Sequence, residues 1–267
     1  MVVWAADGRA GLVRTADGVC QRVGEPGVAL CACGGRVYCA GADACAVYGG
    51  GGDMLDSFAV PGGVVRLCCF GGMICALSTD ADSVTGYSLR SGAIVFSAPA
   101  GVCPRGMAVS PDGRRLAVAG GGSADVTVLD ETLRPLVRYA LPGPAADVCF
   151  VRRGLAALCA GQEDFSSGRL LLITPPGNAE EIAAFPYAPA CLCGLPGGHC
   201  LVGCEGQMMG FRSGGGLFFR RPCGYPAVIR PCPGGILICD SLRGEARLLN
   251  GRLLCRGGDL RDALLTP

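Results

Sequence analysis

The chain has little of what several common functional sites require. Its 267 residues include no lysine, one histidine, one tryptophan and two asparagines. A nucleophile–histidine–acid triad needs a histidine, and His199 directly follows Gly197-Gly198, where a turn histidine is typically solvated. No apolar run reaches the roughly 18 residues of a membrane span, and 23 basic residues against 22 acidic ones leave no basic excess for nucleic acid. We therefore expect no catalytic triad, no membrane partner and no nucleic-acid partner.

Cysteine is abundant, with 19 residues, yet no two cysteines have the C-x-x-C spacing typical of zinc sites. The odd count argues against a disulfide framework. The N-terminal residues 1–7 also lack the basic start and long apolar stretch of a signal peptide. The sequence thus predicts a cytoplasmic protein with reduced thiols.

A glycine-centred turn recurs about every 40 residues along the chain. The turns are, in order, Gly34-Gly35, Gly71-Gly72, Asp112-Gly113, Arg153-Gly154, Gly197-Gly198 and Gly234-Gly235. Each lies between two short apolar runs, and their second residues are 37, 41, 41, 44 and 37 positions apart. This pattern is typical of a β-propeller, in which each repeat is one four-stranded blade.

Alignment on these turns predicts an all-β fold, a single seven-bladed β-propeller over residues 1–267. The blades are expected at residues 260–267 with 1–24, and at 27–60, 63–99, 102–142, 145–187, 189–222 and 225–258. Residues 2–6 indicate a second strand with no first strand before it, and residues 260–265 a first strand with none after it. Pairing of these two strands would close the ring and remove its open edges.

One repeat carries a family resemblance. It contains Ser110-Pro111-Asp112-Gly113, in which proline presets φ while aspartate and glycine form the hairpin corner. With the flanking residues 109–119 and 123–130, this segment resembles the YVTN-type, or YncE-like, propeller repeat; elsewhere only the glycine turns remain. The Trp-Asp dipeptide of WD repeats is absent. The resemblance implies a seven-bladed propeller and little about activity, because such folds host enzymes, binding modules and scaffolds.

Cysteines recur in the predicted first and second strands of the blades. They are Cys31, Cys68 and Cys149 in first strands, and Cys39, Cys75, Cys159 and Cys239 in second strands. Another repeat has Val109 and Val118 at these points, and small apolar thiols suit a tight gap between blades. We expect packing thiols, with no cofactor and no metal; soft-metal or redox chemistry is the alternative.

Loops that lead from one blade to the next lie on the funnel face of a propeller, where ligands usually bind. Here Arg105, Tyr187 and Tyr225 are candidate anion-binding and stacking groups. The alternative is that they pack over neighbouring loops with exposed tips.

Most blades also place an acidic residue after the second strand, on the same face. These residues are Asp7, Asp43, Asp80 or Asp82, Asp125, Asp164, Glu205 and Asp240. Convergence would make an acidic ring suited to a hard cation or a basic partner. We favour the alternative, in which aspartate starts a hairpin loop by accepting hydrogen bonds from its own backbone.

Arginine is dense late in the chain. The residues are Arg212, Arg220, Arg221, Arg230, Arg243, Arg247, Arg252 and Arg256. They are candidates for a basic flank facing an acidic protein, and a solvated outer surface is the alternative.

Together these features favour a non-catalytic binding or scaffold protein, a monomer that uses the funnel for a protein partner or a small ligand. The alternative is a metal-dependent lactonase-like hydrolase. Calcium-dependent gluconolactonase-type propellers use carboxylates and asparagines around the metal, whereas Asn178 and Asn250 fall in predicted turns of the opposite face. Any enzymatic activity would have to rest on Asp, Glu, Cys or Arg.

Overall fold

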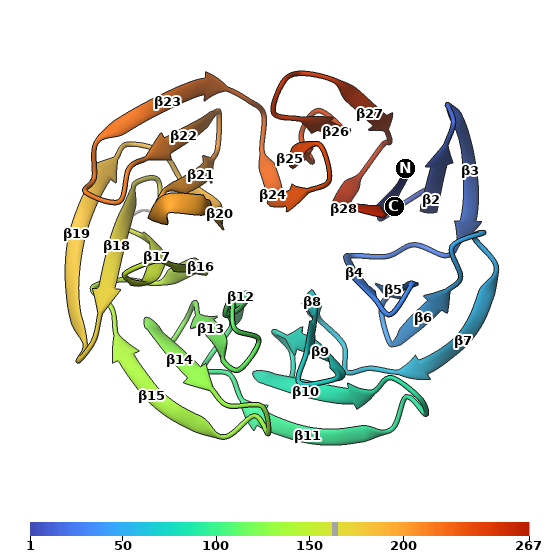
Figure 1. The fold of residues 1–267 in the computed structure, drawn as a ribbon, viewed down its shortest axis with the longest axis horizontal. Helices are drawn as coiled ribbons and strands as arrows, with labels where there is room; N and C mark the ends of the chain where they lie inside the picture. Colours follow the sequence, from blue (N-terminus) through green and yellow to red (C-terminus); the bar gives the residue numbers. More distant parts are fainter. Residues whose placement is uncertain (162–164, 267) are drawn as a thin grey trace.

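The structure, a computed structural model, describes residues 1–161 and 165–266. Seven four-stranded antiparallel sheets surround a central axis as the blades of a propeller (Figure 1). We letter the strands of each blade A to D from the axis outward. The seven-bladed all-β fold expected from the glycine turns is confirmed.

The strands follow chain order around the ring. Blade 1 contains β28 (Leu260–Thr266), β1 (Val2–Asp7), β2 (Gly11–Ala16) and β3 (Val19–Gly24). Blade 2 contains β4 (Ala29–Cys33), β5 (Arg36–Ala40), β6 (Ala44–Tyr48) and β7 (Met54–Ala59). Blade 3 contains β8 (Val64–Phe70), β9 (Met73–Ser78), β10 (Ser83–Ser88) and β11 (Ile94–Pro99). Blade 4 contains β12 (Pro104–Val109), β13 (Leu116–Gly120), β14 (Asp125–Leu129) and β15 (Pro135–Ala140).

The second half of the ring is built in the same way. Blade 5 contains β16 (Ala145–Val151), β17 (Gly154–Ala160), β18 (Gly168–Thr174) and β19 (Asn178–Phe185). Blade 6 contains β20 (Pro189–Gly194), β21 (Cys200–Cys204), β22 (Gln207–Phe211) and β23 (Leu217–Pro222), with a short 3-10 helix η1 (Pro196–Gly198) between β20 and β21. Blade 7 contains β24 (Pro226–Cys232), β25 (Gly235–Asp240), β26 (Glu245–Leu248) and β27 (Leu253–Arg256). No helix in the described residues has the length and apolar character needed to cross a membrane.

The ring is closed by the C-terminal strand. β28 pairs antiparallel with β1, from Val2 opposite Thr266 to Asp7 opposite Leu260, so both ends of the chain lie in blade 1 (Figure 1). Trp4, which is fully buried, donates a hydrogen bond from its indole Nε1 to Thr266 Oγ1 at 3.2 Å. The predicted closure is therefore confirmed, and it gives β1 a hydrogen-bonded strand on each side, β28 and β2.

The hydrophobic core lies between blades. The described residues form seven apolar clusters, and each cluster joins side chains of two adjacent blades. Strands B such as β5 and β13 are buried on both faces, whereas strands D such as β7 and β15 are mostly exposed. Because each blade buries its faces only against its neighbours, the closed ring is needed to complete the core.

Two buried carboxylates form hydrogen bonds between neighbouring blades near the axis. Asp262 of β28 accepts a hydrogen bond from the Leu30 N–H of β4 at 2.8 Å. Asp147 of β16 likewise accepts from the Leu192 N–H of β20 at 2.8 Å. Each carboxylate thereby satisfies an inner-strand N–H that belongs to the next blade, which fixes the relative position of the two blades.

The turns define two ends of the propeller. The B–C and D–A loops lie at one end, which we call the funnel end, and the A–B and C–D turns lie at the other, which we call the turn end. At the turn end, Gly34 and Gly35 have φ of +58° and +74°, a conformation that favours glycine. This is the physical reason for the recurrent glycines on which the repeat was aligned.

Candidate functional site

A cavity of about 540 Å³ follows the axis of the ring. It is lined by the A strands of six blades, β4, β8, β12, β16, β20 and β24. Its wall is mainly apolar side chains and cysteines, with three charged residues among them: Arg66, Asp147 and Arg230. Charged groups this close to the axis are expensive to bury unless they are paired or hydrogen-bonded.

A second cavity, of about 370 Å³, lies at the funnel end of the axis, and Arg66 lines both. We call it the funnel cavity. Its polar and charged lining consists of Arg66, Thr79, Cys103, Arg105 and Tyr225. The remaining lining residues are Val65 and the small residues Ala146, Ala190 and Ala227. Small side chains on three A strands leave the space that the guanidinium groups and the phenol then surround.

Arg66 spans the axis rather than remaining within its own blade. Its guanidinium donates to the Ala227 carbonyl of β24, on the far side of the ring, at 3.5 Å, and to the Val65 carbonyl at 3.2 Å. It also lies close enough to Asp147 to oppose the effect of burial, which raises the pKa of that carboxyl. The two hydrogen bonds to carbonyl groups leave further N–H donors of Arg66 available, because a guanidinium group carries five N–H bonds.

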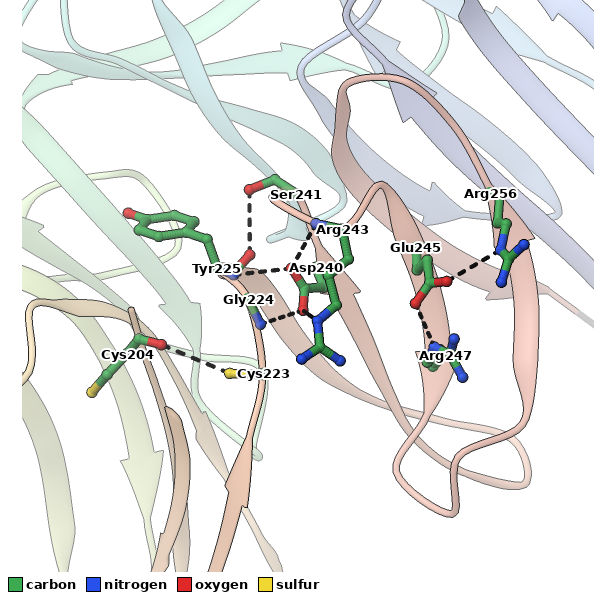
Figure 2. A network of polar contacts seen from close by, with 10 residues as sticks. All are labelled: Cys204, Cys223, Gly224, Tyr225, Asp240, Ser241, Arg243, Glu245, Arg247 and Arg256. Carbon is green, nitrogen blue, oxygen red and sulfur yellow. Dashed lines mark hydrogen bonds and ion pairs between the residues drawn. The ribbon is translucent and has the colours of Figure 1, made fainter. Parts of the chain in front are cut away.

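Tyr225 is held in place by a buried aspartate beneath its loop. Asp240 accepts hydrogen bonds from the Gly224 N–H at 2.7 Å and the Tyr225 N–H at 2.9 Å, and Figure 2 shows the phenol ring directed away from this network. Burial raises the pKa of Tyr225, and the positive charges of Arg105 and Arg66 only partly offset that effect. The hydroxyl therefore stays protonated at neutral pH and is available as a hydrogen-bond donor.

Of the three funnel residues expected from the sequence, the structure brings two together. Arg105 and Tyr225 line the funnel cavity. Tyr187 lies elsewhere: its hydroxyl accepts a hydrogen bond from Arg220 on the outer strand β23, whose guanidinium carbon also sits 5.6 Å from the Tyr187 ring centre. Tyr187 thus packs against a neighbouring blade, which was the alternative considered for all three residues.

The acidic residues at the funnel end do not form a ring. Asp7 accepts hydrogen bonds from the N–H groups of Arg9 and Ala10 within its own turn, at 2.8 and 2.7 Å, and Asp240 is engaged as described above. Asp43, Asp80 and Glu205 are exposed, each in the loop of a different blade, and Asp164 lies outside the described residues. No group of three or more His, Cys, Asp or Glu side chains within the described residues is arranged to hold a metal ion. Asp7 and Asp240 therefore act on backbone N–H groups, as the alternative for the acidic residues had it.

The cysteines correct one expectation. Cys33 of β4 and Cys69 of β8 form a disulfide between blades 2 and 3, whereas the sequence predicted reduced thiols without a disulfide framework. All 19 cysteines lie in the described residues, and the other 17 are free thiols. Burial raises the pKa of most of them, to about 12 for Cys31 and Cys204. Such thiols are inert at neutral pH and behave as apolar side chains.

The strand-B cysteines also do not share one position of the repeat. Cys39 and Cys239 face Leu30 and Val228, whereas Cys75 faces Cys68 and Cys159 faces Ala145. What these cysteines share is burial, not a common position in the strand pairing. Packing requires only burial, whereas a repeated ligand site would require the same position in each blade.

Several of the late arginines are neutralised within the protein and do not form a free basic flank. Arg247 and Arg256 both pair with the buried Glu245, at 2.7 and 3.1 Å (Figure 2). Arg230 pairs with Asp262 inside the ring. The charge density visible in the sequence therefore overstates the positive charge presented by blade 7.

Arg66 is the residue of this site that the sequence analysis missed. A signal for it existed: it is the only charged residue within the apolar A-strand segment from Val64 to Phe70. Nothing in the repeat spacing indicates, however, that this side chain crosses the axis to meet Ala227.

Comparison with known proteins supports the architecture. No protein-family model matches the chain, and no curated protein matches it. Among solved structures, it is similar to a protein from Lactobacillus plantarum at 14% identity and to a "putative 6-phosphogluconolactonase" from Bacteroides uniformis at 11% identity; each match covers 98% of both chains with a TM-score of 0.74. A streptogramin B lyase matches at 15% identity over 85% of this chain and 81% of its own, with a TM-score of 0.67. At these identities the likeness shows the fold, which is the one that the YVTN-type resemblance implies: the chain is a seven-bladed β-propeller.

Proposed function

We propose that this propeller is a non-catalytic binding protein whose funnel cavity holds a small anion. The observation that carries the proposal is the convergence of Arg66, Arg105 and the protonated Tyr225 hydroxyl on one cavity whose lining includes no carboxylate. Guanidinium groups form charge-assisted, often bidentate hydrogen bonds to carboxylate and phosphate oxygens. A volume of about 370 Å³ lies in the range of small-molecule sites.

The two arginines would act differently. Arg66 is restrained by its contacts with two carbonyls and by the nearby Asp147 carboxyl, so it would provide a fixed donor at the floor of the cavity. Arg105 is exposed and would approach the ligand from the rim. Tyr225 would donate its hydroxyl hydrogen and place its ring against an apolar part of the ligand.

The test is isothermal titration calorimetry with inorganic phosphate and with citrate, and with glycerol as the neutral control. We expect wild-type protein to bind at least one of the two anions and Arg105→Ala to weaken that binding about 10- to 100-fold, the usual effect of losing a hydrogen bond to a charged group. Tyr225→Phe should weaken it less. Arg9→Ala is the matched control, because Arg9 is exposed at the same end and does not line the cavity. Failure to bind either anion, or equal losses for Arg105→Ala and Arg9→Ala, would refute the proposal.

The competing proposal, a metal-dependent lactonase-like hydrolase, shares the fold of the neighbour named as a lactonase. The described residues do not fit its metal, because the carboxylates of Asp7 and Asp240 already accept backbone N–H groups and the remaining acids lie in separate loops. Native mass spectrometry of protein purified without oxygen, before and after chelator, distinguishes the two. Chelator-sensitive extra mass would favour the hydrolase. Cytoplasmic location, a monomeric state and a funnel that also serves a protein partner remain part of the binding proposal.

A further inference from the structure

A cavity of about 950 Å³ lies at the turn end and not at the funnel. We call it the arginine groove. Its walls are the A–B turns of blades 4, 5 and 6 and the outer strand β15, and it includes Asp112, Arg115, Arg152 and Arg153. It therefore occupies one sector of the turn end rather than the axis.

The positive charge of the groove comes from three arginines at two A–B turns. Arg115 follows the turn of blade 4, and Arg152 and Arg153 lie in the turn of blade 5, whereas the corresponding turns of blades 3 and 7 are a glycine pair with no arginine. Arg115 lies with its guanidinium carbon 5.5 Å from the ring centre of Phe150, which holds it over the groove. The charge is thus a local departure from the repeat.

These arginines are not neutralised as those of blade 7 are. Arg152 and Arg153 are exposed, and neither forms an ion pair with any other described residue. The carboxylate in the lining, Asp112, is engaged by its own turn: it accepts from the Ser110 hydroxyl and from the Arg114 N–H. Its contact with Arg115 is long, at 3.5 Å, and solvent-exposed, so it offsets little of the charge.

The floor of the groove is apolar. Leu136 and Val137 of β15 are 57% and 36% exposed, and Phe150 and Leu195 line the same cavity. β15 is the outermost strand of its blade, so one of its edges has no neighbouring strand in the sheet. A contiguous apolar floor bordered by charge is typical of a protein-interaction surface rather than of a small-ion site.

We propose that the arginine groove is a docking site for an acidic peptide segment of a partner protein, one that alternates carboxylates with bulky apolar side chains. The carboxylates of such a segment would pair with Arg115, Arg152 and Arg153, because opposite charges attract across an interface. Its apolar side chains would pack on the exposed Leu136 and Val137. The groove has more than twice the volume of the funnel cavity, which suits several residues of an extended chain. This inference is independent of anion binding at the funnel.

The experiment is selection of random dodecapeptides displayed on phage against the whole protein, followed by fluorescence anisotropy with the selected peptides. We expect enriched peptides with at least two acidic and two bulky apolar residues. Arg152→Glu with Arg153→Glu should weaken their binding at least tenfold, and Leu136→Asp should weaken it several-fold. The matched control, Arg36→Glu with Arg90→Glu, makes the same charge change at exposed turn-end positions outside the groove and should leave binding unchanged.

Each other outcome overturns the proposal. No enrichment, enrichment of non-acidic peptides, or equal losses in the two double variants would show that the groove is not an acidic-peptide site. Because all four exchanged arginines are exposed, circular dichroism should show both double variants folded. Competition by inorganic phosphate that disappears in Arg105→Ala would instead place the peptides at the funnel end.

Discussion

The two ends of the propeller use the same charged residue types in different ways. At the funnel end, Arg66 and Arg105 surround a small cavity lined by alanines. At the turn end, Arg152 and Arg153 border a larger, open groove with an apolar floor. Aspartates accept local hydrogen bonds at both ends, Asp240 at the funnel end and Asp112 at the turn end. A net charge of +1 therefore conceals two local groups of arginines, because most of the carboxylates that balance them lie outside the two cavities.

The largest effect should come from opening the ring, which removes both sites together. Deletion of residues 259–267 takes away β28 with its buried Leu260, Leu264 and Leu265. Each buried leucine contributes about 2–5 kcal/mol, and total stability is about 5–15 kcal/mol. We expect no cooperative thermal transition in calorimetry, and loss of both phosphate and peptide binding.

The matched control for this deletion is Arg261→Ala, in the same strand. Arg261 is exposed, and its ion pair among the described residues is with Asp259 at the surface, so the melting temperature should change little. A truncated protein that melts at the wild-type temperature would contradict the role of β28 in the closure.

A smaller effect is expected from a substitution that changes the funnel end and leaves the turn end intact. Asp240→Ala leaves the N–H groups of Gly224 and Tyr225 without their acceptor at a residue that is only 5% exposed. We expect a loss of about 2–4 kcal/mol in the free energy of unfolding, measured in urea. Anion binding should weaken as well, because the Tyr225 loop loses its support. Peptide binding at the arginine groove should be unchanged.

The turn-end counterpart is Asp112→Ala. Asp112 is exposed, and its turn keeps the Gly113 N–H to Ser110 carbonyl hydrogen bond at 2.9 Å. Its loss of stability should therefore be clearly smaller than that of Asp240→Ala. Equal losses in the free energy of unfolding for the two variants would show that burial of a turn aspartate does not determine its contribution to stability.

The fold was predictable because the information is local. A two-residue turn such as Gly34-Gly35 requires left-handed backbone, and its recurrence counts the blades without knowledge of any long-range contact. The closing strand followed from two end fragments that made one blade between them. The disulfide had a signal as well: Cys33 and Cys69 are 36 residues apart, about one repeat, which places them on neighbouring A strands.

The candidate site was only partly predictable because it depends on side-chain direction. Tyr187 and Tyr225 both occupy D–A loops, yet Tyr187 packs against Arg220 of an outer strand while Tyr225 lines the funnel cavity. Loop position alone does not distinguish them. Arg66 crosses the whole ring to Ala227, a contact between residues 161 positions apart that no local pattern encodes.

The smallest effect concerns acid. At the funnel end, burial raises the pKa of Asp7, but hydrogen bonds from the N–H groups of Ala10, Asp259 and Arg9 outweigh it and hold the pKa below the ordinary value of 3.8. A carboxyl with a depressed folded pKa stabilises the protein above its unfolded pKa, and that stability is lost as pH falls below about 3.8 toward the folded value. At the turn end, the Ser110 hydroxyl lowers the pKa of Asp112 in the same direction.

The two aspartates should nevertheless differ in how much they contribute to acid sensitivity. Asp7 is fully buried and joins its turn to the Asp259 N–H near the ring closure, whereas Asp112 is exposed to screening solvent. Between pH 6 and pH 3, Asp7→Asn should reduce the fall in melting temperature by a few degrees, and Asp112→Asn by less. The Asp7 effect should persist in 0.5 M salt, because hydrogen bonds rather than distant charges cause it. The opposite ranking would mean that acid opens the molecule from the turn end, not at the seam where the chain closes its ring.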